Sequence, residues 1–165
     1  MRISALVKPS LLGSFALILG AMMIFIPIHT YAQSQKLESE TVEITTSRGN
    51  FSFEIEIADE PHERTIGLMN RSQLESRGGM LFVFNQPQII QMWMKNTLIS
   101  LDMIFIDASG RVVDVAERTV PHSLDVVASR HKASFVLELA GGMAAFIGLL
   151  PGDRLKHRLF VDEQD

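Results

Sequence analysis

The sequence predicts a mainly β domain of the α+β kind. It would fold as a compact β-sandwich or a partly closed barrel of about seven or eight short strands with two short helices. Three observations support this prediction. Apolar and polar residues alternate with a period of two over residues 42–57. Short apolar runs are bounded by turn residues, as in residues 80–84 and 101–106. Helix signals occur only near Pro61 and Gly141.

The N-terminal segment, residues 1–32, has the layout of a secretory signal peptide. Its first ten residues carry two positive charges and no acid, residues 11–28 are uncharged and mostly apolar, and a small-residue cleavage site ends at Ala32. An uncleaved membrane anchor is the alternative, because this apolar run nearly spans a bilayer. We therefore expect an exported protein, periplasmic or secreted, that contacts a membrane only if the segment stays attached.

The chain after Ala32 has the length of one domain. Residues 33–40 are polar and unpatterned, which predicts a flexible lead-in, and residues 41–165 are predicted to form a single domain. Loss of the two cations Arg2 and Lys8 changes the net charge from −4 to −6, so nucleic acid is not an expected partner. The absence of cysteine excludes disulfides, thiol nucleophiles and thiolate metal sites. The expected partner is a small ligand or an envelope protein.

The first half of the domain predicts a hairpin, a helix and a buried strand. Alternation on both sides of Arg48-Gly49-Asn50 predicts a β-hairpin with one wet face. The run Asp59-Glu60-Pro61 supplies a capping carboxylate, an acid and a proline, which predicts a helix over residues 62–70. Gly78-Gly79 ends that pattern, and the continuous apolar run 80–84 predicts a buried strand.

The second half predicts further short strands and one more helix. The expected strands cover residues 89–95, 101–106, 111–116, 133–139 and 154–161. The turn signal in residues 107–110 separates the second and third of these. Residues 121–132 lack a pattern and predict a long loop, whereas residues 141–148 are rich in alanine and methionine and predict a short helix.

Five motifs follow one another along the domain: ERTIGLM at residues 63–69, GMLFVF at 79–84, WMKNTLI at 93–99, LDMIFID at 101–107 and VLEL at 136–139. In these motifs the chain resembles the DUF192 family, small and often exported bacterial and archaeal proteins whose function is not established. The resemblance covers residues 41–161 and implies a compact β-rich fold without implying a reaction. Two positions depart from the family pattern. Ser100 replaces the usual proline before Leu-Asp, and Met92 replaces the usual aromatic residue before Trp-Met.

The only tryptophan of the chain, Trp93, marks a candidate site. In a strand, Gln91, Trp93 and Lys95 would share one face, and Met92 and Met94 would share the apolar face that suits a core. An indole opposite the core needs something to cover it. Either another strand or the preceding helix packs on it, with the Lys95 stem across the ring, or Trp93 forms the floor of a cleft.

Charged residues near Trp93 in sequence supply the rim of that candidate cleft. Arg64 falls in the first turn of the predicted helix, where a cation opposes the helix dipole and needs a partner. Asp102 and Glu138 interrupt apolar strands, where an unpaired carboxylate is costly. These charges either form structural ion pairs or converge on a small polar or anionic ligand, with Lys95 and Arg64 as counter-charges. The candidate ligand-binding residues are Arg64, Trp93, Lys95, Asn96, Asp102 and Glu138.

Two further functions are open at the level of sequence. Cu(I) prefers thioether ligands, so Met92 and Met94, with Met103 nearby, are candidate metal ligands; alternatively, the three methionines fill the core. Asp102 and Glu138 would form a hydrolase acid pair if they faced each other across a cleft. The chain lacks the motifs of the common nucleophilic, nucleotide-binding and zinc-dependent enzymes, so no catalytic residue is predicted. The favoured function is a non-catalytic binding or accessory module of the cell envelope, with no cofactor other than Cu(I) in the metal-binding alternative.

Overall fold

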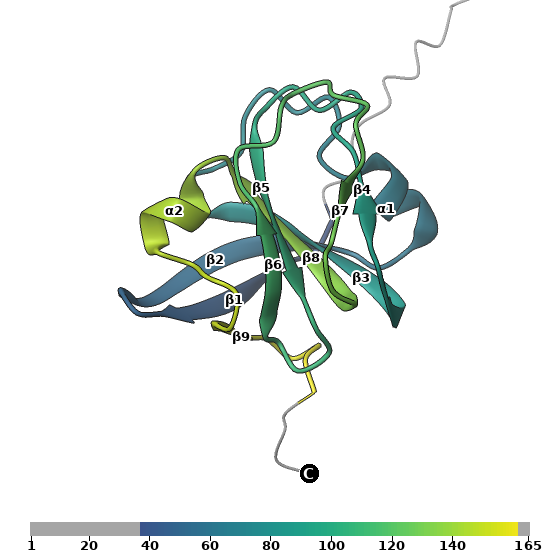
Figure 1. Ribbon diagram of the computed structural model, residues 1–165. Coiled ribbons are helices and arrows are strands. Elements are labelled where there is room, and N and C mark those ends of the chain that lie inside the picture. The colour runs from purple at the N-terminus through teal and green to yellow at the C-terminus, as the bar shows by residue number, and fades with distance from the viewer. Residues whose placement is uncertain (1–36, 162–165) are drawn as a thin grey trace, which may run out of the picture. The chain divides into compact units, whose positions relative to one another are not determined.

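A computed structural model describes residues 37–161, in which nine strands and two short helices form the domain (Figure 1). The strands are β1 (Ser39–Thr46), β2 (Gly49–Ala58), β3 (Gly78–Gln88), β4 (Gln91–Met92), β5 (Leu101–Ile106), β6 (Val112–Ala116), β7 (Val127–Ala128), β8 (Ala133–Ala140) and β9 (Arg154–Lys156). The helices are α1 (Pro61–Ile66) and α2 (Met143–Ile147). The predicted signal peptide, residues 1–32, lies outside the described residues. Between residues 37 and 161, no helix is long and apolar enough to cross a membrane.

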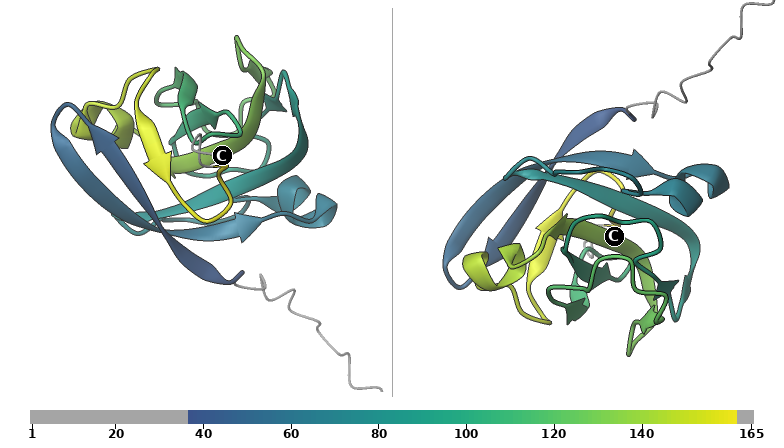
Figure 2. Two further views of the ribbon diagram at one scale, coloured as in Figure 1. Left: turned by 90° about the horizontal axis from the view of Figure 1, so that it is seen from below. Right: turned by 90° about the horizontal axis from the view of Figure 1, so that it is seen from above.

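Seven strands form one sheet in the order β6-β5-β8-β3-β2-β1-β9, and β4 pairs with β7. The pair β2–β3 is parallel, so a crossover that carries α1 must join these two strands, whereas the other pairs are antiparallel. The sheet curls round on itself (Figure 2), and its edges meet at the bridge between Arg111 and Arg154. There the Leu155 N–H donates to the Gly110 carbonyl at 2.8 Å. The predicted mainly β, partly closed barrel is confirmed.

The strands β5 and β8 are buried on both faces and separate two hydrophobic cores. The barrel core lies within the curl of the sheet and includes Val42, Ile44, Phe53, Ile55, Leu81, Ile104, Ile106, Leu137, Leu139 and Ile147. The second core lies on the opposite face, under α1 and the segment around β4, and includes Leu68, Met80, Phe82, Ile90, Met94, Met103, Phe105 and Val136. Because side chains alternate, every residue of β5 and β8 faces one core or the other.

The strand β4 is much shorter than the one predicted over residues 89–95. It pairs with the two-residue strand β7 and ends at Met92. Beyond it, the Met94 N–H donates to the Ser123 carbonyl at 3.1 Å, and Asn96 turns the chain with a φ of 55°. The predicted alternation nevertheless persists in the burial, because Met94 is buried and Lys95 is exposed.

The helix α1 is also shorter than the one predicted over residues 62–70. It starts at Pro61, one residue before the predicted start, and its N-cap is Glu60, in a capping box with Glu63, rather than Asp59. It ends at Ile66 because Gly67 has a φ of 48°, which L side chains rarely adopt. A Cβ on Gly67 would also lie 2.9 Å from the ring of Phe82. This close approach brings the following residues down onto the sheet.

Both ends of the domain differ from the sequence prediction. The strand β1 begins at Ser39, so the end of the predicted lead-in, residues 33–40, already belongs to the sheet. The closing strand predicted over residues 154–161 is regular only as far as Lys156. The chain then leaves the sheet and returns over β1, where Glu40 contacts it.

Asp102 anchors α2 to the sheet. Its side chain is fully buried on the barrel-core face of β5. The carboxylate accepts hydrogen bonds from the N–H groups of Gly142 at 2.9 Å, Ala144 at 2.7 Å and Arg118 at 2.7 Å. Gly142 is the N-cap of α2 and has a φ of 94°. The carboxylate therefore satisfies the free N–H groups at the start of α2, and these groups offset the cost of burying its charge.

We predict that Asp102→Asn lowers the free energy of unfolding by about 3 kcal/mol. The substitution keeps the size of the side chain but replaces an accepting oxygen with a donor, so a buried N–H group loses a charge-assisted partner. Urea denaturation measures the change. Asp125→Asn, at an exposed position, is the matched control and should change stability by less than about 0.5 kcal/mol. Equal losses in the two variants would contradict a structural role for Asp102.

Candidate functional site

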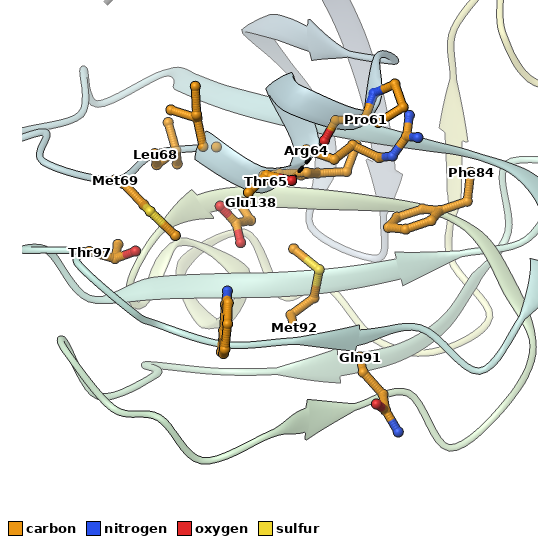
Figure 3. Close-up of a pocket in the computed structure, with 14 residues that line it drawn as sticks. Pro61, Arg64, Thr65, Leu68, Met69, Phe84, Gln91, Met92, Thr97 and Glu138 are labelled. Atoms are coloured by element: carbon orange, nitrogen blue, oxygen red, sulfur yellow. Dashed lines mark hydrogen bonds between the residues drawn. The ribbon is translucent and has the colours of Figure 1, made fainter.

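A pocket of about 390 Å³ lies between α1, the segment that carries β4, and the face of the sheet formed by β3 and β8 (Figure 3). It is lined by Pro61, Arg64, Thr65, Ile66, Gly67, Leu68, Met69, Phe82, Phe84, Gln91, Met92, Trp93, Thr97 and Glu138. Its volume is in the range of small-molecule sites, and its wall is mainly apolar with a few polar groups. Of the lining residues, only Arg64 and Glu138 carry side chains that are charged when ionised.

Glu138 is a buried acid at one end of this pocket. It lies on the second-core face of β8, between Met80 of β3 and Met103 of β5 in the strand register, and is 4% exposed. Among residues 37–161, no side chain or N–H group forms a hydrogen bond or ion pair with its carboxyl group. Burial raises the pKa of Glu138 to about 8, because the apolar surroundings penalise the charged form. At neutral pH the carboxyl group is therefore mostly neutral.

A second buried acid, Glu56, lies on the same face of the sheet and has an arginine partner. It lies across β3 from Glu138, with Met80 between them in the register. Arg71, in the loop after α1, donates two hydrogen bonds to the Glu56 carboxylate, one of them at 2.8 Å. The crossover between β2 and β3 thus supplies a cation to Glu56 and none to Glu138.

Arg64 lines the opposite end of the pocket. Its guanidinium group donates to the carbonyl oxygen of Asp59 and lies over the Phe84 ring, 5.6 Å from the ring centroid. Figure 3 shows this group turned toward Phe84 and away from Glu138. The expected ion pair of Arg64 with Asp102 or Glu138 is absent from the described part of the chain, and a carbonyl and a ring take its place.

The side chain of Trp93 is only partly covered by other residues of the protein. It lines the pocket and is 47% exposed, while the ammonium group of Lys95 lies 5.2 Å from its ring centroid. A cation over an indole face is attracted to it, and the lysine stem covers part of the ring. Trp93 and Lys95 therefore lie together as expected, but Lys95 does not line the pocket.

The structure places Asn96 and Asp102 outside the pocket. Asn96 is an exposed turn residue whose carbonyl accepts from the Asn70 N–H at 2.8 Å. Asp102 faces the barrel core, whereas Glu138 faces the second core, so the two carboxyl groups project from opposite faces of one sheet. This corrects the expectation that Asp102 lines the cleft. It also removes the predicted acid pair, because a hydrolase pair must flank one substrate.

The candidate metal ligands do not form a group. Met94 and Met103 are at most 1% exposed in the second core, and the Thr119 hydroxyl donates to the Met94 sulfur at 3.2 Å. Met92 alone of the three lines the pocket, where it is joined by Met69. Across residues 37–161, no group of three or more His, Cys, Asp or Glu side chains is placed to hold a metal ion.

Sequence reasoning missed much of the pocket wall. Met69 was assigned to a helix that ends three residues earlier, and its position follows from the turn at Gly67. Phe82 and Phe84 were read only as members of a buried strand, although β3 carries them across the floor under α1. Thr97, between the strands predicted over residues 89–95 and 101–106, has no predicted role. The alternation of residues 80–84 is the signal that places Phe82 and Phe84 on one face.

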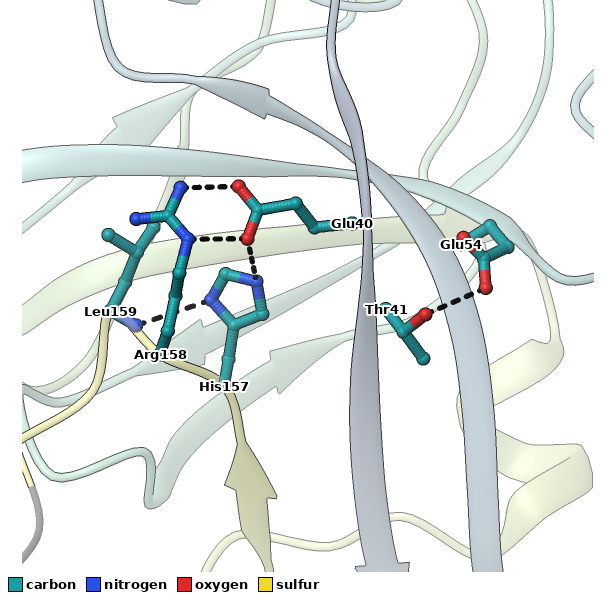
Figure 4. Close-up of polar contacts among 6 residues, drawn as sticks. All are labelled: Glu40, Thr41, Glu54, His157, Arg158 and Leu159. Carbon is teal, nitrogen blue, oxygen red and sulfur yellow. Dashed lines mark hydrogen bonds and ion pairs between the residues drawn. The ribbon is translucent and has the colours of Figure 1, made fainter.

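A second polar cluster joins the C-terminal residues to β1 (Figure 4). Glu40 accepts two hydrogen bonds from the Arg158 guanidinium group, one of them from Nε at 2.6 Å, and it also contacts the Nε2 atom of His157 at 3.2 Å. The hydrogen bond to Arg158 lowers the pKa of Glu40, and burial lowers the pKa of His157. Neither His157 nor Arg158 lines the pocket at α1, and their contacts with Glu40 hold residues 157–161 against the sheet.

We predict that Glu138 makes the protein less stable as pH rises from about 5 to 8. In this range the folded chain keeps a proton that the unfolded chain, with an ordinary glutamate pKa, has released. The free energy of unfolding then falls by up to ~1.4 kcal/mol per pH unit from this one group. Urea denaturation at several pH values measures the difference between wild type and Glu138→Gln. That difference should grow toward pH 8, whereas exposed Glu75→Gln should follow the wild type.

Comparisons with known proteins place the chain in a family. The sequence profile of DUF192, described as Uncharacterized ACR, matches residues 42–157. Among curated proteins, none matches the chain. A solved structure of a candidate transcription regulator from Sinorhizobium meliloti 1021 is 38% identical, with a TM-score of 0.72, over 75% of this chain and 97% of that one. A protein of unknown function from Novosphingobium aromaticivorans DSM 12444 is 35% identical, with a TM-score of 0.73, over 75% of this chain and 89% of that one.

The matched region runs from β1 to His157 and includes every residue that lines the pocket. The two solved structures are similar in both sequence and fold, which agrees with the motifs seen along the chain. The chain belongs to the DUF192 family.

Proposed function

We propose that this protein is an exported, non-catalytic binding or accessory module of the cell envelope, and that the pocket at α1 holds a small ligand with a polar or anionic group. One observation carries the proposal. The pocket ends at a buried carboxyl group, Glu138, for which the described residues supply no partner. A buried polar group without a partner costs free energy, and a ligand that hydrogen-bonds to it recovers that cost.

The arrangement of charges supports binding rather than catalysis. General acid–base chemistry requires a second titratable group, or a nucleophile, within reach of the first. The other ionisable residue that lines the pocket is Arg64, which stays protonated in proteins. Its guanidinium group has five N–H donors, of which one is given to Asp59, so it remains able to bind an anionic group of a ligand.

The proposed location in the envelope rests on residues 1–32. The charged start, the apolar run and the site after Ala32 form the pattern that directs secretion. The lack of cysteine in the remaining chain suits a domain whose stability depends on its two cores rather than on disulfides.

We predict that protein purified from the envelope fraction of its own host carries a small molecule. Native mass spectrometry tests both parts of the proposal at once. The protein mass should equal that of residues 33–165, and gentle activation should release a bound species. Trp93→Ala removes part of the pocket wall and should reduce the bound fraction severalfold, whereas Val126→Ala, at an exposed loop position, should not. A wild-type protein without any bound species would contradict ligand binding.

A second candidate function is Cu(I) handling, and one observation favours it. The thioethers of Met69 and Met92 line the same pocket, and Figure 3 shows both side chains pointing into it. Soft sulfur ligands select Cu(I) over harder ions. The ligand pair then differs from the one predicted from sequence, because Met94 is in the core and Met69 takes its place.

We predict for this alternative that Met92→Leu and Met69→Leu each weaken Cu(I) binding at least tenfold, because each removes one thioether ligand. Competition with a chromogenic Cu(I) chelator measures the affinity. Met143→Leu is the matched control, since Met143 packs against the barrel core, away from the pocket. Absence of Cu(I) binding by the wild type, or equal binding by all variants, excludes the alternative.

A further inference from the structure

The pocket has an ionisable group at each end of an apolar body. Glu138 enters from β8 and Arg64 from α1, and Figure 3 shows their polar ends turned in different directions. We propose that the ligand is a small zwitterion with an apolar body, a proposal that rests on the binding function proposed above. The ammonium group of this ligand lies against Glu138, and its anionic group lies against Arg64. This assigns a charge to each end of the ligand.

The buried carboxyl group specifies the cationic end. Glu138 is more than nine-tenths buried, is aimed into the pocket and has no partner among the described residues. An anion would be repelled there if the group is ionised. An ammonium group brings its own N–H donors and a positive charge, so it satisfies the carboxylate as Arg71 satisfies Glu56 on the same face.

The guanidinium group specifies the anionic end. Arg64 is half-buried and contacts a backbone carbonyl and the ring of Phe84, neither of which neutralises its charge. Within residues 37–161 it forms no ion pair with an acid. Arginine presents a planar fork of donors that matches a carboxylate or phosphate, which makes this end suited to an anion.

The apolar wall specifies the body of the ligand. Phe82, Met92 and other apolar side chains line the pocket. Burial of apolar surface there adds affinity in proportion to the area removed from water. The pocket volume of about 390 Å³ suits a molecule of modest size, such as an ω-amino acid with an aliphatic chain between its two charges.

The proposal makes binding depend on pH in one direction. The side chains that surround Glu138 on β3 and β5 are Met80 and Met103, and the ionisable residue that faces the pocket from α1 is Arg64. The pair formed by Glu56 and Arg71 lies beyond Met80. An ammonium group binds the ionised carboxylate, so it competes with the proton that this carboxyl group holds up to a pH of about 8. Affinity should rise by up to about tenfold per pH unit between pH 6 and 8.

Isothermal titration of the dialysed protein with three sets of probes tests the proposal. The probes are ω-amino acids, the matching carboxylic acids and the matching alkylamines, each with four, five and six carbon atoms. At pH 8 the best ω-amino acid should bind at least tenfold more tightly than either analogue with a single charge. Glu138→Gln should abolish its advantage over the acid, and Arg64→Gln its advantage over the amine. Glu75→Gln, which removes an exposed acid, is the control.

The outcomes separate this inference from the proposed function. If the acids bind as tightly as the amino acids, and only Arg64→Gln weakens them, the binding module stands and the zwitterion is excluded. If affinity of the wild type falls from pH 6 to 8, Glu138 binds as a neutral donor and the ammonium assignment is wrong. The pH series needs no variant, so it does not depend on the folding of Glu138→Gln. If native mass spectrometry finds no ligand and none of the probes binds, both proposals fail.

Discussion

The burial of β5 and β8 on both faces is the constraint on which the rest of this domain depends. Strand pairing satisfies their backbone groups, but a polar side chain on either strand must find its partner inside the protein. Asp102 finds three N–H groups, two at the start of α2 and that of Arg118 in the loop after β6. Glu138 finds no partner among residues 37–161 and is held neutral by its surroundings. The Asp102 carboxylate thus fixes the start of α2, whereas the Glu138 carboxyl group has no hydrogen-bonding partner within the described residues.

Loops near the pocket contain residues with unusual backbone conformations. Within residues 37–161, four residues other than glycine have positive φ, namely Asn70, Asn96, Arg118 and His122. Three of them join neighbouring loops, because the Asn70 N–H donates to the Asn96 carbonyl and the His122 N–H donates to the Thr97 carbonyl. Such conformations persist where surrounding contacts determine them, so these hydrogen bonds hold the loop that carries Trp93 and Thr97 in place.

Sequence reasoning was most successful where the physical signal is local. The alternation in β1 and β2, the apolar run of β5 and the capping residues of α1 each depend on neighbouring residues, and each element was found. Trp93, Arg64 and Glu138 were also identified as belonging together, and all three line the pocket. Strand register was the missing information. A one-residue change of register turns a side chain to the other face, and pairing across β5 and β8 decides that Asp102 and Glu138 point apart.

The parallel pair β2–β3 has a consequence for which part of the pocket wall can change without changing the fold. Parallel neighbouring strands need a connection that passes over one face of the sheet. Here residues 59–77 form that connection, and part of it lines the pocket. The barrel needs this crossover and some of its side chains, because Leu68 packs in the second core and Arg71 pairs with Glu56. The helix α1 itself has no buried residue. Substitutions in α1 can therefore alter the pocket wall while the strand order is retained, which lets the wall change on a constant scaffold.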